Sequence, residues 1–126
     1  MIPENFKTLI EKLKDKTAKK EAIWTKTSRD DEFKLDLEQG AITIDRWESS
    51  FGQSIVDIVV LNEHGDNVDS LELTISDNND YEYLVELHNA AKRAYYKVDE
   101  TFKSIFKELD SDKTIGKDKP SDGLPF

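Results

Sequence analysis

Two hydrophobic periodicities divide the chain into a helical start, a strand-rich middle and a helical end. Near the N-terminus, apolar residues recur every three or four positions, which predicts an amphipathic helix. These residues are Phe6, Leu9, Ile10 and Leu13. Pro3 suits the first turn of this helix, where its missing N–H donor costs nothing. We expect the lysines of the later turns to face solvent at the helix end that favours cations.

The middle of the chain changes to a period of two, which is typical of β-strands. Residues 33–47 alternate apolar and polar side chains on both sides of a turn at Gly40, and so predict a β-hairpin. In the last strand of this region, Leu71, Leu73 and Ile75 are expected on one face. The expected strands are 21–27, the two arms of 33–47, 54–63 and 68–75.

A helical period returns over residues 80–109, with Asp77 or Asn78 as the expected N-cap. No Gly or Pro interrupts this segment, so the sequence predicts one long helix. The residues of its apolar stripe are Leu84, Leu87, Ala91, Ala94 or Tyr95, Val98, Phe102, Ile105 or Phe106, and Leu109.

The element order α-β-β-β-β-β-α predicts an α+β fold with two layers. Alternating strands joined by short turns favour a five-stranded antiparallel meander with one apolar face. The N-terminal helix and the long C-terminal helix are expected to cover that face. We interpret residues 1–110 as a single domain and residues 111–126, which lack periodicity and contain Gly and Pro, as a flexible C-terminal tail.

The length of the C-terminal helix predicts an overhang. A helix over residues 80–109 would be about 45 Å long, whereas five strands about 4.8 Å apart span only about 24 Å. The overhanging part carries apolar residues from Val98 to Leu109, which need a cover. Packing against the N-terminal helix is the simpler expectation, and homodimerisation through the long helix is the other.

Charge narrows the choice of partner. The 126 residues carry a net charge of −9, and residues 30–80 hold fourteen acidic groups against Lys34 and Arg46. Such a surface repels phosphate backbones, so we expect no direct binding of nucleic acid. The exposed sheet face is expected to present acidic side chains, and solubility is the simplest role for them. They are Asp36, Glu38, Asp45 and Glu72.

The sequence gives little support for an enzyme. Without cysteine, the chain has no thiolate ligand or cysteine nucleophile. His64 and His88 have no second histidine at a metal-binding spacing, and the five isolated glycines form no phosphate-binding loop. We therefore expect no catalytic residues, metal or cofactor. No segment is long and apolar enough to span a membrane, and the N-terminal residues are not a signal peptide, so a cytoplasmic location is expected.

The last residues, Leu124-Pro125-Phe126 with Asp122 before them, follow the polar tail. This tip resembles the end of bacterial single-stranded DNA-binding proteins, whose acidic tails finish Asp-Asp-Asp-(Ile/Leu)-Pro-Phe and dock onto replication and repair enzymes. The resemblance implies that Phe126 is the anchor in an apolar pocket and that its carboxylate meets a basic residue there. Pro125 would stiffen the approach, Leu124 would fill the aliphatic position, and Asp122 would supply part of the acidic lead.

The resemblance covers about five residues, and Gly123 stands where that family has its last Asp. The rest of the chain does not resemble the oligonucleotide-binding barrel of the family. We therefore expect a non-enzymatic bacterial or mobile-element protein that binds a protein partner through its tip. The alternative is an acidic inhibitor, such as an immunity protein or a DNA mimic, that binds a basic partner through the sheet face.

Overall fold

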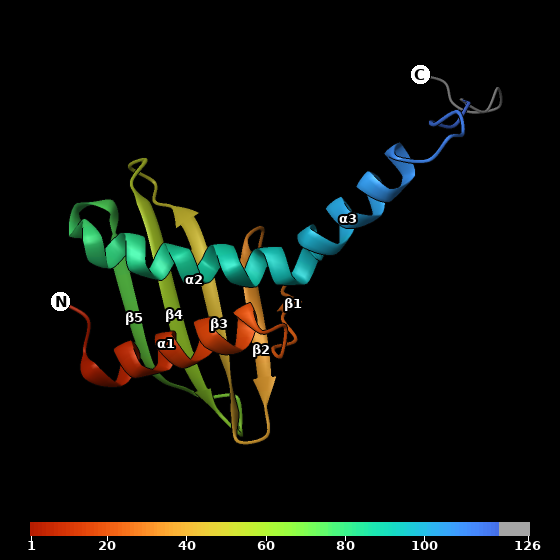
Figure 1. The fold of residues 1–126 in the computed structure, drawn as a ribbon. Coiled ribbons are helices and arrows are strands. Elements are labelled where there is room, and N and C mark those ends of the chain that lie inside the picture. Colours follow the sequence, from red (N-terminus) through yellow and green to blue (C-terminus); the bar gives the residue numbers. More distant parts are fainter. Residues whose placement is uncertain (119–126) are drawn as a thin grey trace.

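The computed structural model describes residues 1–118 and confirms the predicted α+β arrangement (Figure 1). Asp122, Leu124, Pro125 and Phe126 lie outside the described residues. The elements are α1 (Glu4–Ala18), β1 (Thr25–Lys26), β2 (Glu32–Leu37), β3 (Gly40–Glu48), β4 (Ser54–Asn62), β5 (Asn67–Thr74), a 3₁₀ turn (Ile75–Asp77), α2 (Asn79–Tyr96) and α3 (Val98–Leu109).

The five strands form one antiparallel sheet in the order β1-β2-β3-β4-β5, as the meander prediction required. The register aligns apolar residues directly across the strands: Phe33 faces Ile44, and Ile44 faces Ile58. Because side chains alternate between the two faces of a strand, this register places the apolar set on one face. The intervening residues lie on the opposite face, which is called the outer face below.

Helices α1 and α2 lie side by side across the apolar face and complete the second layer (Figure 1). The core therefore lies between the sheet and these two helices. Its largest fully buried side chains are Ile10 from α1, Phe33, Ile44, Val56 and Ile58 from the sheet, and Leu84, Leu87 and His88 from α2.

The first strand is much shorter than the predicted 21–27. The backbone N–H of Glu21 bonds to the carbonyl of Lys16, and Lys20 has a positive φ of 61°, so the chain is still turning back from α1 there. Trp24 then enters the core and donates its Nε1–H to Thr17 Oγ1 at 3.0 Å. This indole anchor fixes the segment to α1, and only Thr25 and Lys26 pair with β2.

The prediction of one uninterrupted C-terminal helix was wrong. Helix α2 ends at Tyr96, Lys97 adopts the left-handed conformation with φ 53° and ψ 48°, and α3 begins at Val98. A left-handed residue is a common way to end a helix, although Gly is the usual choice. Here Lys97 takes the left-handed position in place of a glycine, so the sequence contained no Gly or Pro that would have predicted the end of α2.

The start of α2 also differs from expectation. Asn78 occupies the N-cap position but makes no capping hydrogen bond through its side chain. Thr74 and Asp77 instead form a capping box around the 3₁₀ turn, in which Asp77 Oδ2 accepts from the Thr74 N–H at 2.8 Å. This turn removes Ile75 from the predicted strand face and leaves it exposed.

Candidate interaction surfaces

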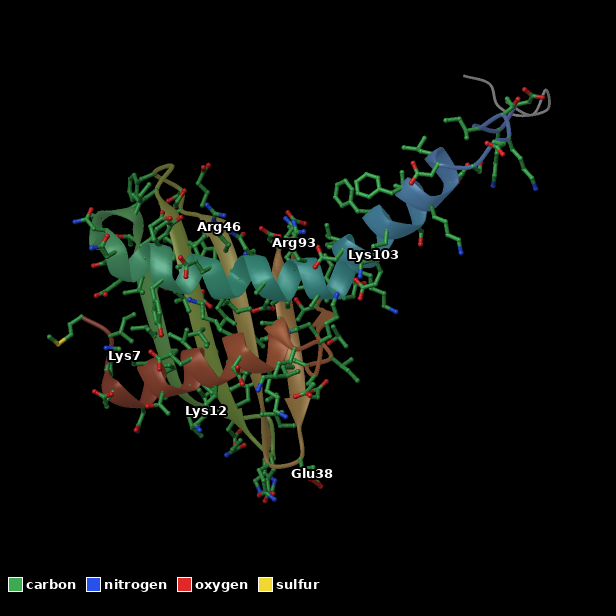
Figure 2. The ribbon with its side chains drawn as sticks, in the orientation of Figure 1. Lys7, Lys12, Glu38, Arg46, Arg93 and Lys103 are labelled. Carbon is green, nitrogen blue, oxygen red and sulfur yellow. The ribbon has the colours of Figure 1, made fainter. Side chains whose placement is uncertain are left out.

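Helix α3 projects from the two-layer body and has no buried residue (Figures 1 and 2). Its large apolar side chains are between 46% and 54% exposed: Phe102, Ile105, Phe106 and Leu109. The expectation that the N-terminal helix covers them was wrong, because α1 packs along α2 and the sheet. Within residues 1–118, this apolar helical surface therefore has no intramolecular cover.

The four side chains form a single stripe, which is called the α3 face below. Relative to Phe102, they stand at positions i, i+3, i+4 and i+7, which share one side of a helix. The rings of Phe102 and Phe106 are in contact, with centroids 5.7 Å apart. The same spacing provides the anchors when an amphipathic helix binds in an apolar groove of another protein.

Charged side chains hold the junction between α2 and α3. Arg93 on α2 donates to Asp99 Oδ1 at 2.7 Å, and Lys20, after α1, lies 3.2 Å from Glu100 Oε2. The hydrogen bond from Arg93 lowers the pKa of Asp99. The pKa of Glu100 is lowered by a hydrogen bond from its own backbone and then by Lys20. These contacts join the base of α3 to both helices of the body.

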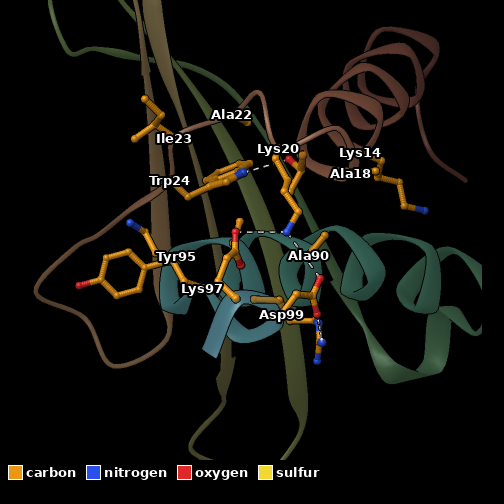
Figure 3. A pocket seen from close by; sticks show the side chains of 14 residues that line it. Lys14, Ala18, Lys20, Ala22, Ile23, Trp24, Ala90, Tyr95, Lys97 and Asp99 are labelled. Atoms are coloured by element: carbon orange, nitrogen blue, oxygen red, sulfur yellow. Dashed lines mark hydrogen bonds and ion pairs between the residues drawn. The ribbon is translucent and has the colours of Figure 1, made fainter. Parts of the chain in front are cut away.

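A hollow of about 510 Å³ lies beside this junction (Figure 3). Its lining combines apolar residues such as Ile23 and Trp24 with charged ones, and Lys20 extends toward Asp99 and Glu100. Three of its four cationic side chains are engaged, because Lys20 and Arg93 pair with Asp99 and Lys14 pairs with Glu86. We interpret it as the space spanned by the junction contacts.

The outer face of the sheet carries a row of four acidic residues, which is called the carboxylate row below. Glu32 on β2 faces Asp45 on β3, Asp45 faces Asp57 on β4, and Asp57 faces Glu72 on β5. Directly opposed side chains in a sheet lie about 5 Å apart, so like charges at these positions repel one another. Neither α1 nor α2 covers this face, as both lie on the other side of the sheet (Figure 1).

The members of the row are not equally exposed. Asp45 was expected to be solvated, but its side chain is only 4% exposed and accepts a 2.6 Å hydrogen bond from Arg29 Nε. Arg29 lies in the turn between β1 and β2, so this hydrogen bond ties the turn to the outer face at Asp45. The partly buried Asp57 accepts from Trp47 Nε1 at 2.8 Å. Burial raises the pKa of Asp57, with smaller contributions from the neighbouring carboxylates.

The structure unites only two of the four predicted acidic residues. Asp45 and Glu72 belong to the carboxylate row, whereas Asp36 lies near the end of β2 beside Lys34 and Glu38 occupies the turn after it. The other two members, Glu32 and Asp57, were not predicted. Asp57 could have been found from the sequence, because it is the single charge inside the apolar run of β4. Glu32 could not have been assigned to the row without the cross-strand register, which places it opposite Asp45.

Neither histidine joins a metal site. His64 is exposed in the turn before β5. His88 is buried, and its Nε2 lies 2.7 Å from the backbone oxygen of Asp31. Desolvation lowers the pKa of His88 despite that hydrogen bond. Within residues 1–118, no group of three potential ligands could hold a metal ion.

Comparison with known families, curated proteins and solved structures finds no match to this chain. Among the helices in residues 1–118, none combines the length and the apolar character needed to cross a membrane.

Proposed function

We propose that this chain is a protein-interaction module whose binding region is its C-terminal arm, meaning α3 and residues 110–126. The observation that carries the proposal is the exposed α3 face, in which four large apolar side chains contribute nothing to the core. Contiguous apolar surface that is left uncovered on a folded protein is typical of an interaction site.

The rest of the arm extends this proposal to a partner class. The tip residues Asp122, Leu124, Pro125 and Phe126 resemble the tail tip of bacterial single-stranded DNA-binding proteins. An aromatic side chain beside a C-terminal carboxylate suits a pocket that is both apolar and basic. We therefore propose that the tip docks onto cytoplasmic enzymes that bind those tails and that it competes with the tails for the same pocket.

A displacement assay tests the tip. A fluorescently labelled tail peptide of a single-stranded DNA-binding protein is bound to a tail-binding enzyme, and its anisotropy is followed as the intact chain is added. The intact chain should lower the anisotropy as it displaces the peptide. A chain that lacks Pro125 and Phe126 should leave it unchanged.

A control variant distinguishes specific binding by the tip from non-specific binding through exposed apolar side chains. Phe51 is 96% exposed in the turn between β3 and β4, far from the arm along the chain. Its replacement, Phe51→Ala, should displace the peptide as well as the intact chain does. Equal activity of the intact and truncated chains, or no activity of either, would remove the tip from the proposal.

The carboxylate row supports a second candidate function, the binding of a basic protein by the outer face. Four carboxylates on adjacent strands concentrate negative charge where no helix covers the sheet. If the chain is an acidic inhibitor that uses the carboxylate row, its complex with a basic protein should weaken as salt concentration rises. Replacing Glu72 with Lys should weaken that complex, and replacing Asp36 with Lys should weaken it less. Equal effects would point to net charge alone.

A further inference from the structure

We propose that the α3 face is covered by α3 of a second copy of this chain, with the two helices antiparallel. This inference rests on the proposed interaction role of the arm and names the occupant of its helical part. A twelve-residue helix is marginally stable alone in water, so packing against a partner is the usual source of its stability. Among residues 1–118, the body of the same chain contacts α3 only at the junction near Lys97.

The charge pattern of α3 is complementary to itself when reversed. Lys103 and Asp110, the C-cap residue that continues α3 in the right-handed helical conformation, are seven residues apart, about two turns, and therefore lie along the same edge of the α3 face. Neither forms an ion pair with another residue in the described part of the chain. A twofold axis near Ile105 and Phe106 would bring Lys103 of each copy close to Asp110 of the other. The pairing would thus join opposite charges twice.

The exposed area predicts a weak dimer. A large apolar side chain has about 200 Å² of surface, so four half-exposed side chains offer about 400 Å² per copy and about 800 Å² per pair. Stable protein interfaces bury at least about 1,200 Å². The pair should therefore form reversibly and depend on concentration, unlike an obligate dimer. Pairing would also carry two C-terminal tips on one assembly, which would raise avidity for a partner that offers two pockets.

Sedimentation velocity over a concentration series tests the pairing with the intact chain. The weight-average sedimentation coefficient should rise from the monomer value toward the dimer value as the protein concentration increases. The double substitution Phe102→Ser with Phe106→Ser should keep the chain monomeric. The control Phe51→Ser removes a still more exposed ring outside α3 and should dimerise as the intact chain does.

Charge reversal tests the antiparallel arrangement. Lys103→Asp would place like charges together at both contacts and should weaken dimerisation by about three- to tenfold. Adding Asp110→Lys to this variant exchanges the two charges and should restore the affinity of the intact chain. Circular dichroism of each variant at a fixed low concentration would show whether α3 itself is retained.

A monomer at every concentration would overturn the proposal, and failure of the exchanged variant to recover would overturn the antiparallel arrangement. These outcomes are separate from those of the displacement assay. A monomeric chain that still displaces the tail peptide would disprove pairing and leave the tip function intact. A dimer that displaces nothing would support pairing and remove the tip.

Discussion

Arg29 Nε lies 2.6 Å from Asp45 Oδ2, so an exposed guanidinium is the hydrogen-bond partner of a buried carboxylate. The direct cross-strand neighbours of Asp45 are Glu32 and Asp57, and both are acidic. Arg29 is therefore the group that compensates Asp45, the most buried member of the carboxylate row. It also fastens the turn between β1 and β2 to the outer face of the sheet.

Replacing Arg29 with Met should lower the melting temperature, because the carboxylate of Asp45 would stay buried without its partner. The double variant Arg29→Met with Asp45→Asn should recover much of the loss, since a neutral amide costs less to bury. Thermal unfolding followed by circular dichroism measures both changes. Equal melting temperatures for the single and double variants would contradict a compensating role for Arg29.

Asp57→Asn should stabilise the fold at neutral pH. The pKa of Asp57 is raised by burial, so the folded state binds a proton more readily than the unfolded state does. The free energy of unfolding therefore falls as pH rises through that pKa, and the ionised carboxylate lowers stability above it. Asn keeps an acceptor for the Trp47 Nε1–H and removes the charge. Allowing for partial solvent screening, we expect a gain of at most about 1 kcal/mol.

Denaturant unfolding at neutral and acidic pH measures this gain. The advantage of Asp57→Asn should shrink as pH falls toward the range in which the aspartic acid itself is protonated. Asp36→Asn, at an exposed position on the same face, is the matched control and should change stability little. A variant that is destabilised at neutral pH would show that the charge of Asp57 contributes to folding.

His88 should make stability depend on pH in the mildly acidic range. Its pKa in the fold is below the ordinary value of about 6.5, because burial against Phe33 disfavours the charged ring. The nearby Asp31 opposes this shift, while Lys92 and Arg46 reinforce it. Below pH about 6.5 the unfolded state takes up the proton first, so stability is lost as pH falls toward the folded pKa.

The replacement His88→Gln should remove that contribution to the pH profile. Its amide can still donate to the backbone oxygen of Asp31, which keeps the contact that Nε2 makes. Free energies of unfolding measured from pH about 5 to 7.5, a range that spans the ordinary histidine pKa, should follow a shallower slope in the variant. Identical slopes for the two proteins would assign the acid sensitivity to other groups.

Substitutions in α3 should leave the stability of the body unchanged. At a concentration low enough to exclude association, Phe102→Ser with Phe106→Ser should not change the melting temperature, because neither ring is buried. Leu87→Ala in α2 is the contrasting variant. It removes a fully buried side chain and should cost about 2 to 5 kcal/mol. A comparable loss from the α3 substitutions would mean that the helix folds back on the body.

The tip at residues 122–126 and the carboxylate row illustrate two limits of prediction from sequence. The tip is a local motif, so its residues were identified directly from the chain, and its function stays a prediction. The row is assembled from four strands, and only the register brings Glu32, Asp45, Asp57 and Glu72 together. The sequence prediction named Asp45 and Glu72, which belong to the row, together with Asp36 and Glu38, which lie outside it.

Local periodicity by itself determined the element order as far as α2, the antiparallel meander and the apolar residues that face α1 and α2, because a strand or helix must turn one side toward the core. Tertiary contacts decided the features that periodicity does not encode. Trp24 shortened the first strand, Arg29 buried Asp45, and the ion pairs of Asp99 and Glu100 hold α3 at an angle after Lys97. In each case a contact between residues from different elements of the fold determined the local conformation. Such a contact leaves no signal in the local periodicity of the sequence.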